Sequence, residues 1–596
     1  MKKSHFLQTL YLQKPLFLIL LIATLSTLPW IGLGDFYTKG EPREAALAVS
    51  MIEKGEWVIP SSYADEFAYK PPFNHWLIAG FSLALTHGEV TPFTSRLPST
   101  IAFIAMIGVC FMFFARRRPV IEAFVSCLIL ITCFEIHRAA MTTRVDMELT
   151  FLLVAAIIQM YAWYQKRRVY QLISIWLLLS MATLTKGPIG VLLPCMIFGV
   201  FLLFQKENFF KATVKCILIA LPAFIIPLIW YYAAYKIKGE AFFDRVFYEN
   251  FGRFLHLKAA DMDASYELGH DGPFWIYIVY LVSGFLPWTI LLVISLFFLK
   301  YKRVSGSVKQ MINNIVGKIM TMDKALLYSL IVIVVSLLFY SIPVSKRSVY
   351  IMPVYPFIAI FIARFFIYLV DAKPKAVRIS TSILLGISII ALLIIGLAYT
   401  RIVDIEAIAG HFAKRERTLQ DIKIFSDMFK SPGWLGLFGI SILLCATINS
   451  IYLLRKKINI KILMAGFGIM FSINVFMDSY LLSNFKDTYS ARPFAEMISE
   501  KYKPDGEIYV TNNLKKYFNL YALNFYLHNN FKNIDLESPK EGYFVTLEKY
   551  SDSIRQEYGN KYEFELLEKS DKLNEYRTSM LFYRIKLRNY SALAND

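Results

Sequence analysis

The chain has 596 residues, 56% of them hydrophobic, and a mean hydropathy of +0.47. A soluble protein would be expected to contain about 45–50% apolar residues, so this composition, with long apolar runs, excludes a soluble protein and predicts a polytopic membrane protein. The formal charge of +19 could indicate nucleic-acid binding. The charge distribution excludes that class, because Lys and Arg gather in short loops between apolar runs, as the positive-inside rule describes.

The apolar runs predict an α-helical protein with about thirteen transmembrane helices, each near the length that crosses the hydrocarbon core. The first run follows Lys2 and Lys3 without a small-residue cleavage site, so it is predicted to be a span and not a signal peptide. The expected spans are residues 15–34, 96–115, 119–137, 146–165, 169–184, 187–205, 213–235, 273–299, 325–344, 348–370, 378–399, 434–454 and 461–483.

With a cytoplasmic N-terminus, every basic loop falls on the cytoplasmic side. The first loop on the opposite face, residues 35–95, and the tail from residue 484 then share one side of the membrane. The tail is more polar, with expected strands at 507–511, 521–527, 543–547, 562–567 and 581–585 and helical patterns at 493–501 and 547–558. We therefore expect a transmembrane domain, residues 1–483, followed by a soluble α/β domain, residues 484–596.

The first outer loop holds the densest group of charges beside a span. Pro42 suits a first helical turn, which predicts a helix from there to about Lys54 with an apolar side lying in the membrane interface. Glu41 would sit at its N-terminus, where the helix dipole favours an ionised carboxylate able to accept a proton. Glu44 follows one turn along. The alternative for Glu41 is an ordinary acidic residue at a helix start.

Lys70 lies between Tyr69 and two prolines, which stiffen the backbone. A lysine held at a membrane surface is a good phosphate ligand. The alternative is a lysine whose stem lies along apolar surface while its charge reaches water.

Further charges stand at the outer ends of later spans. Asp146 and Glu148 open the fourth span, where carboxylates are costly unless paired or used. Lys186 lies at a break between two spans, and Lys346 and Arg347 fill a very short outer loop. Outward-facing cations run against the positive-inside trend, and a bound phosphate would explain them.

The outer loop 236–272 adds Arg253 and His270. Arg253 is a candidate to help Lys70 bind a phosphate, and His270 precedes the next span. With Glu249 or Asp271 nearby, His270 is a candidate ligand of a divalent metal, although no spacing typical of a metal site supports it. A hydrogen-bonded structural histidine is the alternative. The six cysteines all fall within apolar spans, and no CxxC pair occurs.

A series of motifs follows in order along residues 15–370: GEPREAALAVSMIEKGEWVIP, FAYKPPFNHWLIA, SRLPS, VDMELTF, TKGPIGVLLP, YENFGRF, HDGPFWIYI and GFLPW. In order and spacing they resemble the polyprenyl-phosphate-sugar-dependent glycosyltransferases of the GT-C class. The closest type is the lipid A 4-amino-4-deoxy-L-arabinose transferases, related to protein O-mannosyltransferases. The resemblance implies a GT-C fold and sugar transfer from polyprenyl (undecaprenyl) phosphate to lipid A, a glycan or a protein. It places the site and C-terminal domain at the periplasmic face of a bacterial inner membrane.

The resemblance also assigns roles, with two departures. The family's first-loop pattern is Asp-Glu-x-Arg-Tyr, and Gly40 stands at the aspartate, while Glu41 and Arg43 match the second and fourth positions. Lys70 matches the lysine that holds the lipid phosphate. Tyr69 replaces a glutamate implicated in metal binding. Two further positions match by the same resemblance: Asp146 the family aspartate of its span, and His270 the metal's histidine partner. A divalent metal is thus a candidate cofactor.

We therefore expect an inverting glycosyltransferase in which Glu41, Glu44 or Asp146 positions or deprotonates the acceptor. Cations would stabilise the departing lipid phosphate. The candidate phosphate ligands are Arg43, Lys70, Lys186, Arg253, Lys346 and Arg347. The rival is a transporter or flippase of anionic lipid-linked substrates, which would place charges near the bilayer midplane on broken helices. An inactive scaffold is also compatible with Gly40.

Overall fold

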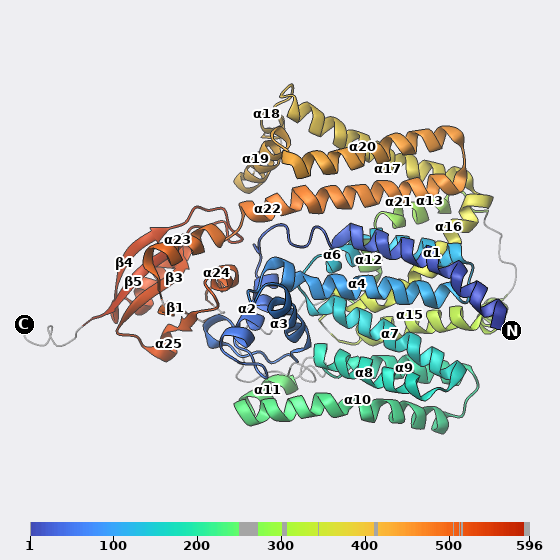
Figure 1. Ribbon diagram of the computed structural model, residues 1–596, viewed down its shortest axis with the longest axis horizontal. Helices are drawn as coiled ribbons and strands as arrows, with labels where there is room; N and C mark the ends of the chain where they lie inside the picture. The colour runs from blue at the N-terminus through green and yellow to red at the C-terminus, as the bar shows by residue number, and fades with distance from the viewer. Residues whose placement is uncertain are drawn as a thin grey trace, which may run out of the picture.

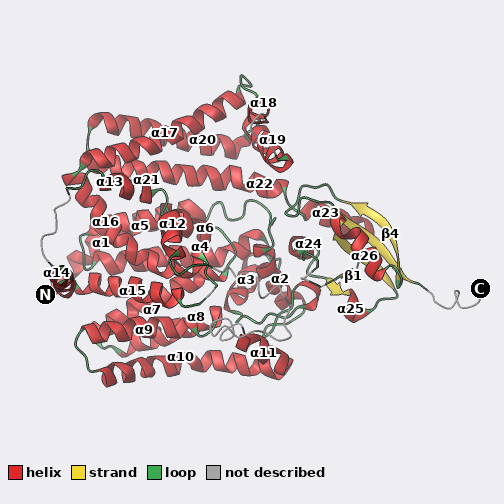
Figure 2. Ribbon diagram, turned by 180° about the vertical axis from the view of Figure 1, so that it is seen from behind, coloured by secondary structure: helices red, strands yellow, loops and turns green. Residues whose placement is uncertain are grey.

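A computed structural model describes residues 2–248, 272–300, 307–343, 345–410, 415–504, 506–511, 513 and 516–588. Long helices lie side by side in one helical body, and a small mixed domain is attached at the end far from the N-terminus (Figure 1). Figure 2 shows that the strands gather in that domain. The residues joining the two parts are the C-terminal end of the last long helix and the segment 35–95, called here the outer segment.

The long helices agree with the expected spans. Within the described residues, nine helices are long and apolar enough to cross a membrane, or up to eleven if each of two bent pairs is one span. Two shorter apolar helices, over Gln13–Thr27 and Ile189–Phe204, coincide with the remaining two expected spans. The chain is thus a multi-pass membrane protein. The long helices are α1 (Lys2–Thr27), α4 (Pro92–Ala115), α7 (Val145–Lys166), α8 (Val169–Lys186), α9 (Ile189–Phe204), α10 (Phe209–Lys238), α15 (Lys324–Ser341), α16 (Tyr355–Ala372), α17 (Pro374–Tyr399), α20 (Gly433–Lys456) and α21 (Asn459–Phe476).

Two spans are bent, and their bends pack against each other. Helices α5 (Val120–Thr132) and α6 (Phe134–Ala140) meet at 67°, and α12 (Ile276–Gly284) and α13 (Trp288–Leu296) meet at 107°. The Phe134 amide donates to the Leu286 carbonyl at 3.0 Å, and the Trp288 indole donates to Thr132 at 3.0 Å. These bonds satisfy polar groups that the breaks would otherwise leave exposed to lipid.

The shorter helices lie mainly at the two ends of the helical body. They are α11 (Glu240–Phe247), α14 (Val308–Met320), the 3-10 helix η4 (Ser348–Val354), α18 (Ile405–Gly410), α19 (Glu416–Lys430), the π-helical turn η5 (Met477–Leu481) and α22 (Leu482–Thr488).

The outer segment contains α2 (Gly40–Glu53), the 3-10 turn η1 (Tyr63–Asp65) and α3 (Phe73–Leu85). Helix α2 begins two residues before the predicted start, since Pro42 is accommodated within its first turn. The prediction that its apolar side lies in the membrane interface is wrong. Those side chains are buried, because α3 packs on one side of α2 and the C-terminal domain on another.

The C-terminal domain has a five-stranded sheet in the order β2-β1-β3-β5-β4. Strand β1 pairs in parallel with β2 and β3, and β5 pairs antiparallel with β3 and β4. The strands are β1 (Ile508–Val510), β2 (Phe531–Asn533), β3 (Glu541–Leu547), β4 (Tyr562–Lys569) and β5 (Met580–Leu587). The helices are α23 (Arg492–Tyr502), α24 (Tyr521–Tyr526), α25 (Ile534–Glu537), η6 (Glu548–Tyr550) and α26 (Ser551–Tyr558).

One expected strand of this domain is wrong. Residues 521–527 are rich in aromatic residues, which favour strands, yet they form α24. This helix is buried on both sides, between the domain core and α2, so long-range packing overrides the local preference. The short strand β2 was not expected.

Candidate functional site

The predicted site residues converge where α2, the stretch after η1, α7 and α8 meet. A pocket opens there between α2, the stretch after η1 and the start of α3. Helix α2 supplies Arg43 and Glu44, and the stretch leading into α3 supplies Lys70. The pocket is lined by Arg43, Glu44, Leu47, Ser62, Glu66, Phe67, Ala68, Tyr69, Lys70 and His75.

Glu44 is a buried carboxylate in this pocket. Its Oε2 lies 2.8 Å from Nε2 of His75, at the start of α3. Burial disfavours the charged form, but the hydrogen bond to His75 and the charges of Lys70 and Arg43 hold the pKa of Glu44 well below its usual range. Glu44 is therefore ionised at neutral pH and held in a fixed orientation.

Asp146, near the start of α7, is a second carboxylate that interacts electrostatically with Lys70. The Nζ of Lys186, at the end of α8, is 2.5 Å from Oδ1 of Asp146, and this ammonium also lies 4.5 Å from the Tyr350 ring. Lys70 interacts electrostatically with both Asp146 and Glu44. The structure thus brings together two carboxylates and two lysines that the sequence placed in three separate segments.

Four cations of this region form no salt bridge with a carboxylate among the residues that the structure describes. Within the described ranges, no side-chain hydrogen bond or ion pair is formed by Arg43, Lys70, Arg144 or Arg347. Arg43 interacts electrostatically with Glu44, Arg144 with Asp146, and Arg347 with Lys186. Cations left unpaired at one site create a region of positive potential that favours an anion.

Glu41 is placed differently from Glu44. Both of its carboxylate oxygens bind Arg96 of α4, at 2.8 and 3.1 Å, and Oε1 also accepts from the Thr143 amide at 3.0 Å. Despite burial, the charges of Arg96 and Lys486 lower the pKa of Glu41 to about 2. The same guanidinium donates to the carbonyls after α1, of Ile31, Leu33 and Gly34. Glu41 therefore fixes the start of α2 to two spans.

Arg96 and Arg144 were not among the site residues predicted from the sequence. Each stands at the outer end of a span, so their position against the positive-inside trend was a usable signal. The side chain of Arg144 lies directly beside Gly40. A Cβ added at Gly40 would lie 3.3 Å from Nη2 of Arg144, so the guanidinium occupies the volume that a side chain at position 40 would face.

Some of the remaining predicted residues lie within the described residues and others lie outside them. Lys346 is 5% exposed and its Nζ donates to the Pro343 carbonyl at 2.7 Å, while its neighbour Arg347 is exposed near Lys186. Glu148 turns toward α4 and accepts from Ser99 at 2.9 Å. Arg253 and His270 lie outside the described residues.

The metal prediction rests on a residue outside the described ranges. Among the described residues, no group of three His, Cys, Asp or Glu side chains could hold a metal ion. Tyr69, at the position of the family glutamate, instead lies 4.7 Å from the guanidinium of Arg245, which pairs with Glu66 at 2.5 Å. The described donors do not fit a divalent ion, and metal binding through His270 stays a prediction.

Known proteins share this fold. Residues 69–230 match the family model of dolichyl-phosphate-mannose-protein mannosyltransferases. A crystal structure of ArnT from Cupriavidus metallidurans bound to undecaprenyl phosphate aligns with a TM-score of 0.67 and 16% identity, over 95% of this chain and 97% of that one. The chain has the fold of ArnT. This confirms the predicted polytopic GT-C fold with a C-terminal α/β domain.

Several relatives match by sequence, and two of them are described here. Both are undecaprenyl phosphate-alpha-4-amino-4-deoxy-L-arabinose arabinosyl transferases. The protein from Shewanella sediminis is 24% identical over 396 residues, which is 64% of this chain and 65% of that protein. The protein from Proteus mirabilis is 26% identical over 375 residues, or 61% and 62% of the two chains. The chain thus matches less than two thirds of the length of these relatives.

Proposed function

We propose that this protein is a glycosyltransferase that moves a sugar from polyprenyl (undecaprenyl) phosphate to an acceptor at the outer face of a bacterial inner membrane. The observation that carries the proposal is a group of four cations, Arg43, Lys70, Arg144 and Arg347, which form no salt bridge with any described residue and lie near the carboxylates of Glu44 and Asp146. The names of the relatives and of the structural neighbour support the donor class. The acceptor is lipid A, a glycan or a protein.

The cations would hold and stabilise the phosphate. As the bond between the anomeric carbon and the phosphate oxygen breaks, its electron pair passes to the departing polyprenyl phosphate. A preorganised cation next to that oxygen lowers the barrier. Lys70 lines the pocket and interacts electrostatically with Glu44 and Asp146, which supports this role for it, and Arg43, Lys186 and Arg347 would assist.

A carboxylate would activate the acceptor. The acceptor oxygen attacks the anomeric carbon on the side opposite the phosphate, which inverts the configuration, and its proton passes to the carboxylate. Glu44 and Asp146 are the two candidates, since both border Lys70. Glu41 has both oxygens bound to Arg96, so we assign it the role of anchoring α2.

Sugar transfer by the purified full chain in detergent tests this function. A panel of polyprenyl-phosphate sugars is offered to wild type, Lys70→Ala and Asp146→Asn, with Lys572→Ala on the exposed surface of the C-terminal domain as the matched lysine control. We expect transfer by wild type and the control, and losses of about 10²-fold in each site variant. Folded wild type that binds polyprenyl phosphate but transfers from no donor would overturn the proposal and favour a lipid transporter.

A further inference from the structure

The C-terminal domain contacts both walls of the pocket. One wall is α2, which carries Arg43 and Glu44. The other is the stretch from residue 56 to Lys70, in which residues 60–68 form a tight turn, called here the outer hairpin. The Ala68 amide donates to the Pro60 carbonyl at 2.8 Å, and Ser61 pairs with Phe67. Neither wall is part of a membrane span, so their spacing depends on what holds them together.

The outer hairpin is inserted into the core of the C-terminal domain. Tyr63, at its tip, is buried with Tyr521 and Phe531, whose ring centroids lie 5.2 and 5.6 Å away. On the other wall, Phe525 of α24 packs against Phe36 and the apolar side of α2. A single short helix of the domain therefore lies between the two walls.

Asn529 hydrogen-bonds to both walls at once. Its amide nitrogen donates to the carbonyl of Ala46 in α2, at 3.3 Å, and to the carbonyl of Ser61 in the outer hairpin, at 3.0 Å. Its oxygen accepts from the Asn524 amide at 2.7 Å, which fixes the orientation of the group. The side chain is 1% exposed, so water cannot replace these bonds.

The same serine is also bound by Glu56. Glu56 accepts from the Ser61 amide at 2.8 Å and from its hydroxyl at 2.6 Å, and also from the Ser50 hydroxyl of α2 at 2.5 Å. Ser61 is thus a fixed point between α2 and the domain. From Ser61 the chain continues through the outer hairpin to Lys70.

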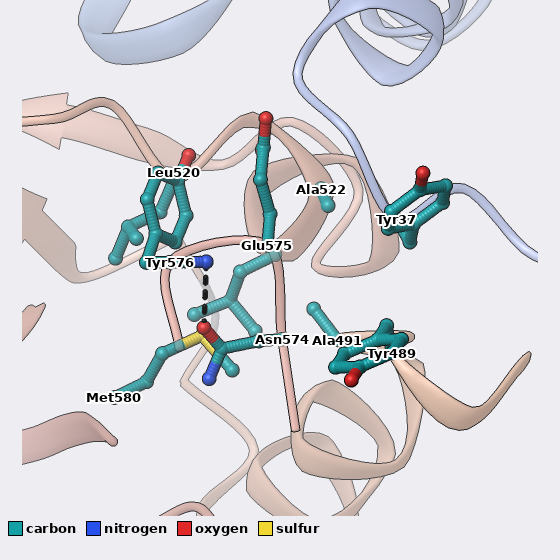
Figure 3. Close-up of a pocket in the computed structure, with 10 residues that line it drawn as sticks. Tyr37, Tyr489, Ala491, Leu520, Ala522, Asn574, Glu575, Tyr576 and Met580 are labelled. Carbon is teal, nitrogen blue, oxygen red and sulfur yellow. Dashed lines mark hydrogen bonds between the residues drawn. The ribbon is translucent and has the colours of Figure 1, made fainter. Parts of the chain in front are cut away.

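A second contact holds the start of α2. The carboxylate of Glu575 accepts from the amide of Lys39, the residue before the helix. Figure 3 shows the pocket beside this contact, where Tyr37 of the outer segment lies across from Glu575 and Tyr576. The domain therefore contacts α2 both at its start and in its middle.

We propose that Asn529 is a positioning residue of the transferase, and that the C-terminal domain uses it to set the distance between α2 and the outer hairpin. This inference rests on the proposed function. A phosphate held jointly by Arg43 on α2 and Lys70 beyond the hairpin requires a fixed spacing of the two walls. Displacement of a reacting group by about 1 Å can lower the rate by about 10²-fold.

The test replaces the amide donor without changing its size. In full-length protein, Asn529→Asp keeps the shape and tolerates the left-handed backbone at this position, φ 53°, but points an oxygen at the two carbonyls. Asn560→Asp is the control for the added charge: this residue lies on the exposed surface of the C-terminal domain. The measured quantities are the Kd of undecaprenyl phosphate, and kcat and the donor KM of sugar transfer.

We expect Asn529→Asp to raise the Kd and the donor KM about fivefold or more and to lower kcat about tenfold, whereas Asn560→Asp leaves Kd and KM at wild-type values. A residue needed only for folding would reduce the amount of active protein but leave Kd and KM unchanged. That result, in protein whose wild type binds and transfers, overturns the inference and leaves the proposed function standing. Wild type that neither binds nor transfers overturns both.

A second variant tests the same role if Asn529→Asp does not fold. Asn524→Asp removes the donor that orients the Asn529 amide but leaves its contacts with Ala46 and Ser61 sterically intact. We expect the same rise in Kd and KM, about twofold to threefold. Unchanged constants in this variant would count against the positioning role.

Discussion

At the scale of single residues, the site is defined by charges that are paired and charges that are not. Glu41 and Arg96 satisfy each other, as do Asp146 and Lys186. Arg43, Lys70 and Arg144 have no such partner among the described residues. Unpaired charge at a membrane boundary is costly, so the cations are best explained by an anionic ligand that is bound during function.

The pair of Glu41 and Arg96 is expected to stabilise the fold more than it serves catalysis. Replacing Glu41 by Gln leaves the buried Arg96 charge without its partner, which costs about 3–5 kcal/mol. We expect Glu41→Gln to lower the melting temperature clearly, while the kcat per folded molecule stays within about tenfold of wild type. A normal melting temperature combined with a complete loss of transfer would instead make Glu41 the catalytic base.

The same carboxyl gives a dependence of stability on pH. The pKa of Glu41 falls from its ordinary 4.5 to about 2 in the folded protein. Its stabilisation, about 3 kcal/mol, is therefore complete above pH 4.5 and is lost as the pH falls toward 2. We expect this acid loss of stability, measured as unfolding in detergent between pH 5 and 2, to be smaller in Glu41→Gln. An equal loss of stability with falling pH in wild type and in Glu41→Gln would contradict this prediction.

Gly40 offers a direct test of the unpaired cations. The Cβ of a residue at this position would lie 3.3 Å from Arg144, so the carboxylate of Gly40→Asp would pair with that guanidinium. We expect Gly40→Asp to weaken binding of undecaprenyl phosphate about threefold to tenfold, by about 1 kcal/mol. Gly40→Asn is the uncharged control and should bind nearly normally. Equal affinities would show that Arg144 does not face the phosphate.

At the scale of helices and strands, the sequence predicts those elements that a short stretch of residues defines by itself. Each expected span coincides with a helix or a bent pair, because about twenty consecutive apolar residues define a span by themselves. The apolar side of α2 was assigned to the membrane interface because its true cover, α24, lies far away in the chain and was itself predicted to be a strand. Pairs such as Glu44 with His75 have no local signal.

The outer hairpin is an element whose fold depends on another domain. Tyr63 fills a space in the core of the C-terminal domain, so Tyr63→Ala should cost about 3–5 kcal/mol, as for other buried aromatic residues. We expect rapid proteolytic cleavage between residues 55 and 70 in this variant. Tyr63→Phe keeps the ring packing and should be cut nearly as slowly as wild type. Slow cleavage of both would mean that the hairpin is held elsewhere.

At the scale of the whole molecule, the site lies at one end of the helical body, between it and the C-terminal domain (Figure 1). The basic loops predicted to face the cytoplasm include the one after α20, at the opposite end. The arrangement of the charges thus agrees with the positive-inside rule and predicts a periplasmic site.

Labelling in intact cells tests this orientation. A membrane-impermeant thiol reagent should modify Lys540→Cys, on the exposed surface of the C-terminal domain, but not Lys457→Cys, in the exposed loop after α20. Labelling is compared with that of the parent chain, which has six cysteines of its own. Modification of only Lys457→Cys would reverse the assigned topology.

The contact between Asn529 and Ser61 also sets an order of events during synthesis. The two residues are separated by 468 positions in the chain. At about 5–20 residues per second, a ribosome needs roughly 25–90 s to reach the second after making the first. Throughout that time the outer hairpin has no domain in which to bury Tyr63, and the two walls of the pocket have no common support. On the proposed function, sugar transfer can therefore begin only after the last hundred residues have been made and the C-terminal domain has folded.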